Sequence, residues 1–257
     1  KNIIIATGKN RRPNIPTWEG QENFKGKIIH CRFYKNPKPY AGQKVLVVGM
    51  GNTGAEVALD LSEHGVETSI SVRGEIALVP RDLNGRPVQL TAKKLAKIPF
   101  GLGDWLGSQI RKIYFGNLAK YGLSISKMHP AVMLRETGKT PVIDIGTVAQ
   151  IKAGKIKVLP DINRFCDTGV EFNNGEKHDF DVVLLATGFH ADLHDFVQNT
   201  DNLLDKCNLP KSPIGTGGQA GLYFVGFDNY KLGGILGTIF NDSETVVEKI
   251  KMMSEKH

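Results

Sequence analysis

Cysteine is scarce in this chain, and no two cysteines stand near each other. The 257 residues include three, at Cys31, Cys166 and Cys207. Such wide spacing excludes a Cys-x-x-Cys redox pair and a cysteine-rich metal knuckle, so the sequence predicts no metal site. Isolated cysteines are also typical of proteins kept reduced, which favours a cytoplasmic location.

Long hydrophobic runs and blocks of one charge are missing too. No uncharged apolar run reaches the roughly eighteen residues of a membrane-spanning helix. The nearest candidate, 100–118, is interrupted by Asp104, Arg111 and Lys112. The net charge is +7, but the basic residues are scattered along the chain. The sequence therefore predicts no membrane span and no nucleic-acid partner.

The start of the chain lacks an initiator methionine and a signal peptide. It opens directly on Ile3-Ile4-Ile5-Ala6-Thr7-Gly8, which we interpret as a buried strand running into a turn. A core strand at the terminus has no earlier strand to pair with, so we expect further sequence upstream.

The most informative stretch runs from Lys44 to His64. Residues 44–48 are rich in β-branched side chains and predict a buried parallel strand, and 55–64 continue with an apolar helical face. Between them stand three glycines at the spacing of a dinucleotide fingerprint. The first permits a tight turn, the second lets the backbone approach a pyrophosphate, and the third lets helix and strand pack closely. We predict a pyrophosphate site at the helix start, with a plain turn as the alternative; its residues are Gly49, Gly51, Asn52, Thr53 and Gly54.

The following strand, predicted for 67–72, indicates which dinucleotide binds. It ends about twenty residues beyond the glycines, where an acidic side chain would bind the ribose of NAD. Arg73 stands at that position, and a guanidinium suits the 2′-phosphate of NADP. We predict NADP, with Glu75 as a ribose-binding acid as the alternative. Arg81 is a second candidate for the phosphate.

A helical insertion is predicted at about 80–140. After turn signals, a short helix is expected at 89–97 and an amphipathic helix at 103–121. We expect the apolar face of the second helix to pack in the core, and a lid or wall over a substrate is the alternative. That face consists of Trp105, Leu106, Ile110, Ile113, Tyr114 and Leu118.

Strands return from Val142 onward. Short β segments at 155–159, 169–172 and 180–185, with a tight-turn signal at 173–175, predict a β-meander ahead of a final buried strand. Ala186-Thr187-Gly188 follows that strand. Near the end we expect a buried strand at 221–227 and a closing helix at 236–253 with a lysine-rich end.

One ordered set of residues resembles a known family. Phe24, Gly26, His30 and Tyr34 form a Phe-x-Gly-x-x-x-His-x-x-x-Tyr sequence just upstream of the glycine loop. This is similar to the identifying sequence of class B flavin-containing monooxygenases. The Ala-Thr-Gly turns at 6–8 and 186–188 fall in the family's order.

Three further stretches resemble the YUCCA-like branch of that family, which acts on indole-3-pyruvate. They are Ser71-Val72-Arg73, 138–146 and 221–227. The resemblance covers nearly the full chain.

The resemblance implies an α/β flavoprotein with two dinucleotide-binding domains and the cofactors FAD and NADPH. Residues 1–40 would belong to the FAD-binding domain and the linker, 41–187 to a Rossmann-like NADP domain, and 188–257 to the return into the FAD domain. The motif around His30 would link the domains and help NADP binding, so His30 is not assigned as a general base. Ala186, Thr187 and Gly188 would form a hinge beside the cofactors, and 228–237 would cover part of the pocket.

The family's FAD fingerprint and its active-site asparagine have no counterpart in this sequence. A complete enzyme of this layout would need roughly a hundred or more residues before Lys1. The implied function is therefore that of the C-terminal part of a monooxygenase. NADPH would reduce FAD, and the reduced flavin would use O2 to transfer one oxygen atom to a small substrate. The catalytic residues stay unassigned.

Two other functions stay open at this point. A disulfide reductase of the pyridine-nucleotide type shares the architecture, although its cysteine pair would have to lie in the missing FAD half. An inactive NADP-binding fragment is the other alternative. The exact substrate, the binding of FAD by the isolated chain and the oligomeric state, including a homo-oligomer, are not predicted by the sequence.

Overall fold

In the computed structural model the chain forms two compact units. The first comprises Lys1–Asn14, Leu134–Gly138 and Gly188–His257, and the second comprises Ile15–Met133 and Lys139–Thr187. The structure describes residues 1–83, 85–88, 91, 94, 98, 102–137, 140–200, 202–205, 208–227 and 234–255. The predicted domain boundary at residue 40 stays a prediction, while the two compact units divide between residues 14 and 15.

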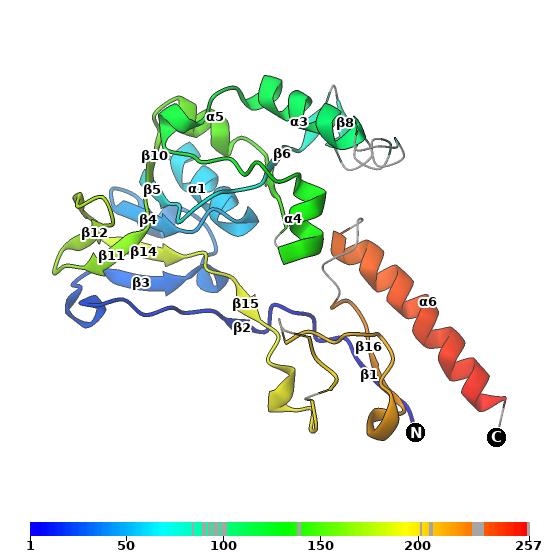
Figure 1. Cartoon of the computed structure of the whole chain (residues 1–257). Helices are drawn as coiled ribbons and strands as arrows, with labels where there is room; N and C mark the ends of the chain where they lie inside the picture. Colours follow the sequence, from blue (N-terminus) through cyan, green and yellow to red (C-terminus); the bar gives the residue numbers. More distant parts are fainter. Residues whose placement is uncertain are drawn as a thin grey trace. The chain divides into compact units, whose positions relative to one another are not determined.

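The second unit is built on a five-stranded parallel sheet in the order β10-β5-β4-β14-β3. Its strands are β3 (Lys27–His30), β4 (Lys44–Val48), β5 (Glu67–Ser71), β10 (Ile156–Leu159) and β14 (Val182–Leu185). Figure 1 shows them side by side from β3 to β10. The predicted strands at 44–48 and 67–72 are confirmed. The edge strand β3 was not predicted, because its apolar residues are few and it carries the family motif.

Both faces of this sheet are covered, which explains why β14 and all of β4 after Lys44 are apolar and buried. On one face Val45 and Val47 pack with Ala58 of helix α1 (Asn52–Glu63) and Ile151 of helix α5 (Thr147–Lys152). On the other face Leu46 and its neighbours pack against a group of aromatic side chains. That group contains Phe24, Phe165, Phe172 and Phe180.

Two of these aromatic side chains, Phe165 and Phe172, come from an antiparallel β-meander. It consists of β11 (Ile162–Phe165), β12 (Gly169–Phe172) and β13 (Lys177–Asp179). A meander ahead of a final buried strand was predicted. The segment at 155–159 was wrongly included in the meander, because it forms β10 of the parallel sheet, whereas the final buried strand predicted at 180–185 is confirmed as β14. The turn at 173–175 joins β12 to β13, whose polar sequence gave no strand signal.

The insertion between β5 and β10 contains shorter elements. They are β6 (Leu78–Pro80), β7 (Asp82–Leu83), β8 (Arg86–Pro87), α3 (Leu102–Phe115), α4 (Pro130–Thr137) and β9 (Val142–Asp144). Strands β6 and β9 pair in parallel, and β7 and β8 form an antiparallel pair. The helix predicted at 89–97 lies largely outside the described residues.

The amphipathic helix of the insertion differs from its prediction in two ways. Helix α3 ends at Phe115, since Gly116 takes a left-handed φ of 65°. The expected core face is also wrong in part, because Trp105, Ile113 and Tyr114 are 58%, 84% and 50% exposed. Leu118 is buried as predicted.

The first unit contains a two-stranded parallel sheet, β1 (Ile3–Ile5) with β16 (Leu222–Phe224), and helix α6 (Gly234–Ser254). The buried strand predicted at the N-terminus is wrong for Ile3 and Ile4, which are 63% and 52% exposed. The predicted strand and helix near the C-terminus are confirmed, with the strand shorter than expected.

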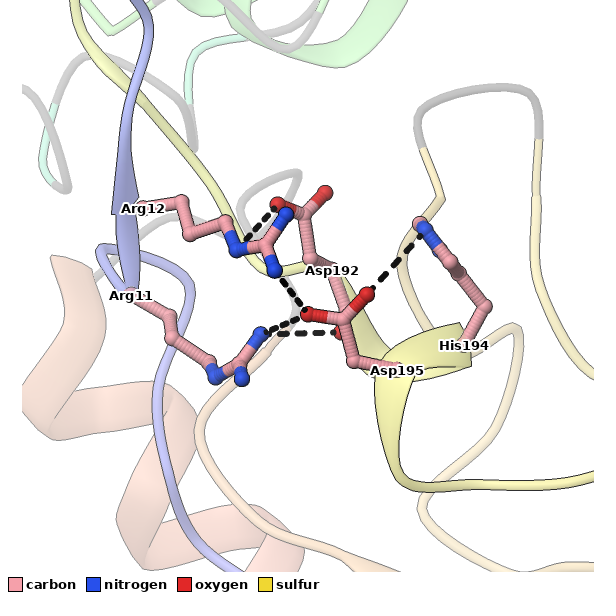
Figure 2. Close-up of polar contacts among 5 residues, drawn as sticks. All are labelled: Arg11, Arg12, Asp192, His194 and Asp195. Carbon is pink, nitrogen blue, oxygen red and sulfur yellow. Dashed lines mark hydrogen bonds and ion pairs between the residues drawn. The ribbon is translucent and has the colours of Figure 1, made fainter.

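A second strand pair in the first unit, β2 (Arg12–Pro13) with β15 (Phe189–His190), carries a cluster of charges. Figure 2 shows Arg11 and Arg12 converging on Asp195, with N···O distances of 2.5 and 2.9 Å. The hydrogen bond from Arg11 is the main reason why the pKa of Asp195 is lowered. The cluster fixes the N-terminal segment against the chain that follows residue 188.

Six short 3-10 turns complete the described elements: η1 (Gln21–Asn23), η2 (Cys31–Phe33), η3 (Lys38–Tyr40), η4 (Ala119–Tyr121), η5 (Leu193–Asp195) and η6 (Gly217–Gln219). Of the helices that the structure describes, none has the length and apolar character needed to cross a bilayer.

Candidate nucleotide-binding site

The glycine loop lies at the point where the strand order of the sheet reverses. From β4 the chain proceeds outward to β5 and β10 on one side, while β14 and β3 lie on the other. In open α/β sheets, ligands bind outside the carboxyl ends of the strands at such a switch point. The loop after β4 and the turn after β14 meet there, since Ala186 N–H donates to the carbonyl of Val48 at 2.9 Å.

Two of the glycines are required by close backbone approach. Gly49 has a φ of 100°, and a Cβ added there would lie 2.9 Å from the carbonyl oxygen of Ala186. At Gly54 a Cβ would lie 1.9 Å from the carbonyl oxygen of Gly49. Gly51 differs, because a Cβ there would meet nothing within 4 Å. The backbone at Gly51 thus faces open space, as a loop that receives a phosphate should.

The start of α1 offers hydrogen-bond donors to that space. Gly51 is the N-cap and has no side chain to bond the free N–H groups of the first turn, and the first turn has no acidic residue. Together with the positive end of the helix dipole, these N–H groups form an anion-binding arrangement. Thr53 is exposed in this turn.

The side chain of Asn52 is engaged elsewhere. Its Oδ1 accepts a hydrogen bond from Ile143 N–H at 2.8 Å, and its Nδ2 donates to the carbonyl of Pro141 at 3.2 Å. A phosphate contact by Asn52 would therefore use its backbone N–H. The sequence gave no sign of this amide pairing, because the partners are about ninety residues away.

Arg73 lies beside the loop in the register of the sheet. Val48 of β4 pairs with Ser71 of β5, and Gly49 N–H donates to the carbonyl of Ser71 at 2.9 Å. Arg73 follows two residues later and is exposed, as is Glu75. Arg81 is less available, because its Nε is 2.6 Å from an oxygen of Asp82.

The Ala-Thr-Gly turn after β14 is divided between the two units. Ala186 lies close to the glycine loop, because a Cβ added at Gly49 would meet its carbonyl oxygen and one added at Gly54 would meet its Cβ. Gly188 has a φ of 88° and accepts a hydrogen bond from Asn14 N–H at 2.9 Å. A glycine suits that position because other residues rarely adopt a positive φ.

The family motif has structural roles throughout. Phe24 is buried and meets Phe165 edge to face at 5.3 Å between ring centroids. A Cβ at Gly26 would lie 2.6 Å from the carbonyl oxygen of Asp181, so only glycine lets β3 approach β14 there. His30 is 4% exposed, and its Nδ1 accepts a hydrogen bond from Arg32 N–H at 3.1 Å.

Tyr34, the last residue of the motif, connects the segment to α1. Its hydroxyl donates to Asp60 Oδ2 at 2.6 Å, and its ring stacks on Tyr40 at 5.7 Å. Burial, followed by the hydrogen bond to Asp60, raises the pKa of Tyr34. Burial also raises the pKa of the nearby Cys31 thiol to about 12. Phe24, Gly26 and Tyr34 thus hold residues 24–34 against the rest of the second unit, while the bond between His30 and Arg32 lies within the segment.

Among the described residues, no group of three or more His, Cys, Asp or Glu side chains is arranged to hold a metal ion. The structure brings together the glycine loop, Arg73 and Ala186. It does not bring the motif residues Phe24 and Gly26 to the loop, since they lie at the start of β3 and the loop lies at the strand ends.

Comparison with known proteins places this geometry in a family. A sequence model described as flavin-binding monooxygenase-like matches residues 1–208. The chain belongs to this family. It is 37% identical over 252 residues to the rice (Oryza sativa subsp. japonica) protein named indole-3-pyruvate monooxygenase YUCCA4, covering 98% of this chain and 57% of the relative. It is 40% identical over 228 residues to the Arabidopsis thaliana protein named probable indole-3-pyruvate monooxygenase YUCCA3, covering 88% and 52%.

Solved structures share the fold. A flavin-containing monooxygenase from Stenotrophomonas maltophilia aligns with a TM-score of 0.64 at 19% identity, covering 98% of this chain and 63% of that one. A steroid monooxygenase bound to NADP aligns with a TM-score of 0.67 at 14% identity, covering 99% and 61%. The predicted fold class, an α/β flavoprotein architecture, is confirmed. The chain spans little more than half the length of the curated relatives that it matches.

Proposed function

We propose that this chain is the C-terminal part of an FAD- and NADPH-dependent flavin monooxygenase, which inserts one oxygen atom from O2 into a small organic substrate. The observation that carries the proposal is the glycine loop at the switch point of the sheet, in a chain of the flavin-binding monooxygenase-like family. Indole-3-pyruvate is the first candidate substrate, because the two relatives described above are named for it.

The residues around the loop fit a dinucleotide. Open space at Gly51 and the uncapped start of α1 suit a pyrophosphate, which backbone N–H groups would hold. The exposed Arg73 would pair with the 2′-phosphate, and Arg81 could do so after leaving Asp82. Pyrophosphate and adjacent contacts are proposed for Gly49, Gly51, Asn52, Thr53, Gly54, Ala186, Thr187 and Gly188.

FAD, when bound, would supply the reaction of a reduced flavin with O2. We propose that the part of the relatives that this chain does not cover supplies the FAD fingerprint. The contribution of this chain would be to hold and orient NADPH and to keep water from the reacting groups. Its own residues are assigned no proton transfer.

The alternatives find less support. For a disulfide reductase, Cys31 would be a poor nucleophile, since burial raises the pKa of its thiol to about 12. Family membership also favours a monooxygenase. An NADP-binding module without turnover stays open for the isolated chain. Widely spaced cysteines still lead us to expect a cytoplasmic location.

The test compares this chain with a version extended upstream. We expect both to bind NADPH, and the extended protein alone to be yellow, to oxidise NADPH and to oxygenate an indole keto acid. Removing O2 should stop turnover, which serves as the control. An extended protein that binds NADPH but no flavin would contradict the monooxygenase and favour the binding module. Absence of NADPH binding in both versions would contradict the proposed dinucleotide site.

A further inference from the structure

The segment from Thr140 to Gly146, part of a stretch that resembles the YUCCA-like branch, packs onto the first turn of α1. The side-chain amide of Asn52 makes two hydrogen bonds to this segment. Its Oδ1 accepts from Ile143 N–H at 2.8 Å, and its Nδ2 donates to the Pro141 carbonyl at 3.2 Å. An amide that accepts and donates in this way replaces the pairing that a neighbouring strand would give. Asn52 is the first residue of α1, so its own N–H is among the donors proposed for the pyrophosphate.

Further contacts continue the junction along the helix. Thr147 Oγ1 donates a buried hydrogen bond to the carbonyl of Ala55 at 2.9 Å. Asp144 Oδ1 accepts from Val148 N–H at 3.0 Å and thereby bonds a free N–H at the start of α5. Gly146 has a φ of 141°, and a Cβ there would meet Leu59 of α1 at 3.4 Å. The segment is thus held in one conformation against α1.

The same segment closes the insertion. Strand β6, where the insertion begins, pairs in parallel with β9, where it ends, through Leu78 with Val142 and Pro80 with Asp144. Asn52 therefore bonds to the chain at the common base of the insertion. The first turn of α1 therefore provides the backbone donors proposed for the pyrophosphate and, through the Asn52 side chain, the bonds to the base of the insertion.

We propose that Asn52 is a positioning residue that couples nucleotide binding to the base of the insertion at residues 140–147. This inference rests on the proposed binding of NADPH at the glycine loop. The backbone N–H of Asn52 would bind the phosphate, and its side chain bonds to residues 141–143. A nucleotide that fixes the first turn of α1 should therefore also fix residues 141–143. Such coupling is reciprocal. Loss of the bonds from Asn52 to the segment should lower the affinity for the nucleotide, and a bound nucleotide should slow amide hydrogen exchange in the segment.

The experiment measures NADPH affinity by nucleotide fluorescence and amide hydrogen exchange with and without NADP⁺, on this chain and on Asn52→Ala. In the wild type, NADP⁺ should slow exchange in residues 49–55 and also in 140–148. In Asn52→Ala, protection of 49–55 should persist while protection of 140–148 is lost. The NADPH dissociation constant should rise on the order of tenfold.

Two further variants sharpen the result. Thr147→Val removes only the bond to Ala55 and should reduce the protection of 140–148 by a smaller amount, which keeps the test open if Asn52→Ala fails to fold. Asn163→Ala is the matched control. Its amide donates to Glu171 at 3.0 Å in the meander, and its loss should leave both measurements unchanged.

Protection of 140–148 by NADP⁺ that is equal in the wild type, Asn52→Ala and Thr147→Val would overturn the coupling while leaving the nucleotide site intact. Failure of the wild type to bind NADPH would overturn the proposed function, and the coupling with it.

Discussion

Gly54 stands where no side chain fits, and it shows how one residue sets the distance between a helix and a strand. A Cβ would lie 1.9 Å from the carbonyl oxygen of Gly49 and 3.1 Å from Cβ of Ala186. The first of these neighbours is backbone and cannot rotate away. The close packing of α1 on β4 thus depends on this position.

We expect Gly54→Ala to destabilise the chain by at least about 2 kcal/mol, because α1 must move away from β4. NADPH binding should weaken in parallel. Urea unfolding would measure the change. Gly74→Ala is a matched control, since a Cβ there meets nothing within 4 Å. Equal unfolding midpoints for the two variants would contradict the packing argument.

Arg73 is the residue that should decide between the two nicotinamide cofactors. We expect Arg73→Ala to lose about 2 kcal/mol of NADPH binding, or roughly thirtyfold in dissociation constant, and to leave NADH nearly unchanged. The reason is that only NADPH carries the 2′-phosphate. Titrations with both nucleotides test this, with Arg86→Ala as the control for loss of an exposed arginine on β8. An equal loss of affinity for both nucleotides would contradict the assignment of Arg73 to the 2′-phosphate and would favour Glu75 as a ribose-binding acid.

At the scale of elements, the edge strand β3 is held by side chains beyond its own ladder. Lys27 to His30 pair with β14, and on either side of the strand Phe24 packs against the meander and Tyr34 bonds to Asp60 of α1. An edge strand pairs on one side only and leaves a row of N–H and C=O groups without a strand partner. Phe24 and Tyr34 of the family motif thus anchor the chain at the two ends of β3.

Tyr34→Phe tests the anchor at the C-terminal end of β3, because it removes only the hydroxyl that bonds to Asp60. Losing a partly buried hydrogen bond to a carboxylate should cost about 1 to 2 kcal/mol of unfolding free energy. The pKa of Tyr34 is raised in the folded state, so its contribution is full below about pH 10, where the unfolded tyrosine titrates, and is lost as pH rises further. Stability should therefore fall less steeply above pH 10 in Tyr34→Phe than in the wild type.

Tyr121→Phe is the control for that variant, because Tyr121 contributes its ring to a contact with Lys120 at 5.0 Å. Unfolding curves at several pH values decide the matter. A wild-type pH dependence in Tyr34→Phe would show that the hydroxyl of Tyr34 is not the titrating group.

At the scale of the whole molecule, the two units differ in how their cores are built. The second unit buries apolar residues on both faces of a five-stranded sheet. In the described part of the first unit, a cluster of six buried residues packs around the two-stranded sheet. Two-stranded sheets are marginal by themselves.

We expect amide hydrogen exchange to separate the units. Amides of β4 and β14 should exchange only through global unfolding, whereas those of β1 and β16 should exchange through smaller openings and thus orders of magnitude faster. An extension upstream that packs on Ile3 and Ile4 should slow exchange in β1. Equal protection of β1 and β4 in this chain would contradict the difference.

The sequence by itself determined the parallel strands β4 and β5, the start of α1 and the place of the glycine loop, because these depend on local apolar periodicity and on glycine spacing. It also carried the family, through the order of Phe24, Gly26, His30 and Tyr34. It did not reveal β3, which has only two apolar residues, or β13, whose three residues are all polar. It also overestimated burial for Trp105, Ile113 and Ile3.

Only the tertiary structure decided which groups meet. The approach of Ala186 to Gly49, the pairing of β6 with β9 and the bonds from Asn52 to residues 141–143 all join segments far apart in the chain. Local propensity does not encode such contacts, since they arise when parallel strands align their carboxyl ends at one edge. That alignment turns a glycine loop, an arginine and a distant turn into one candidate site.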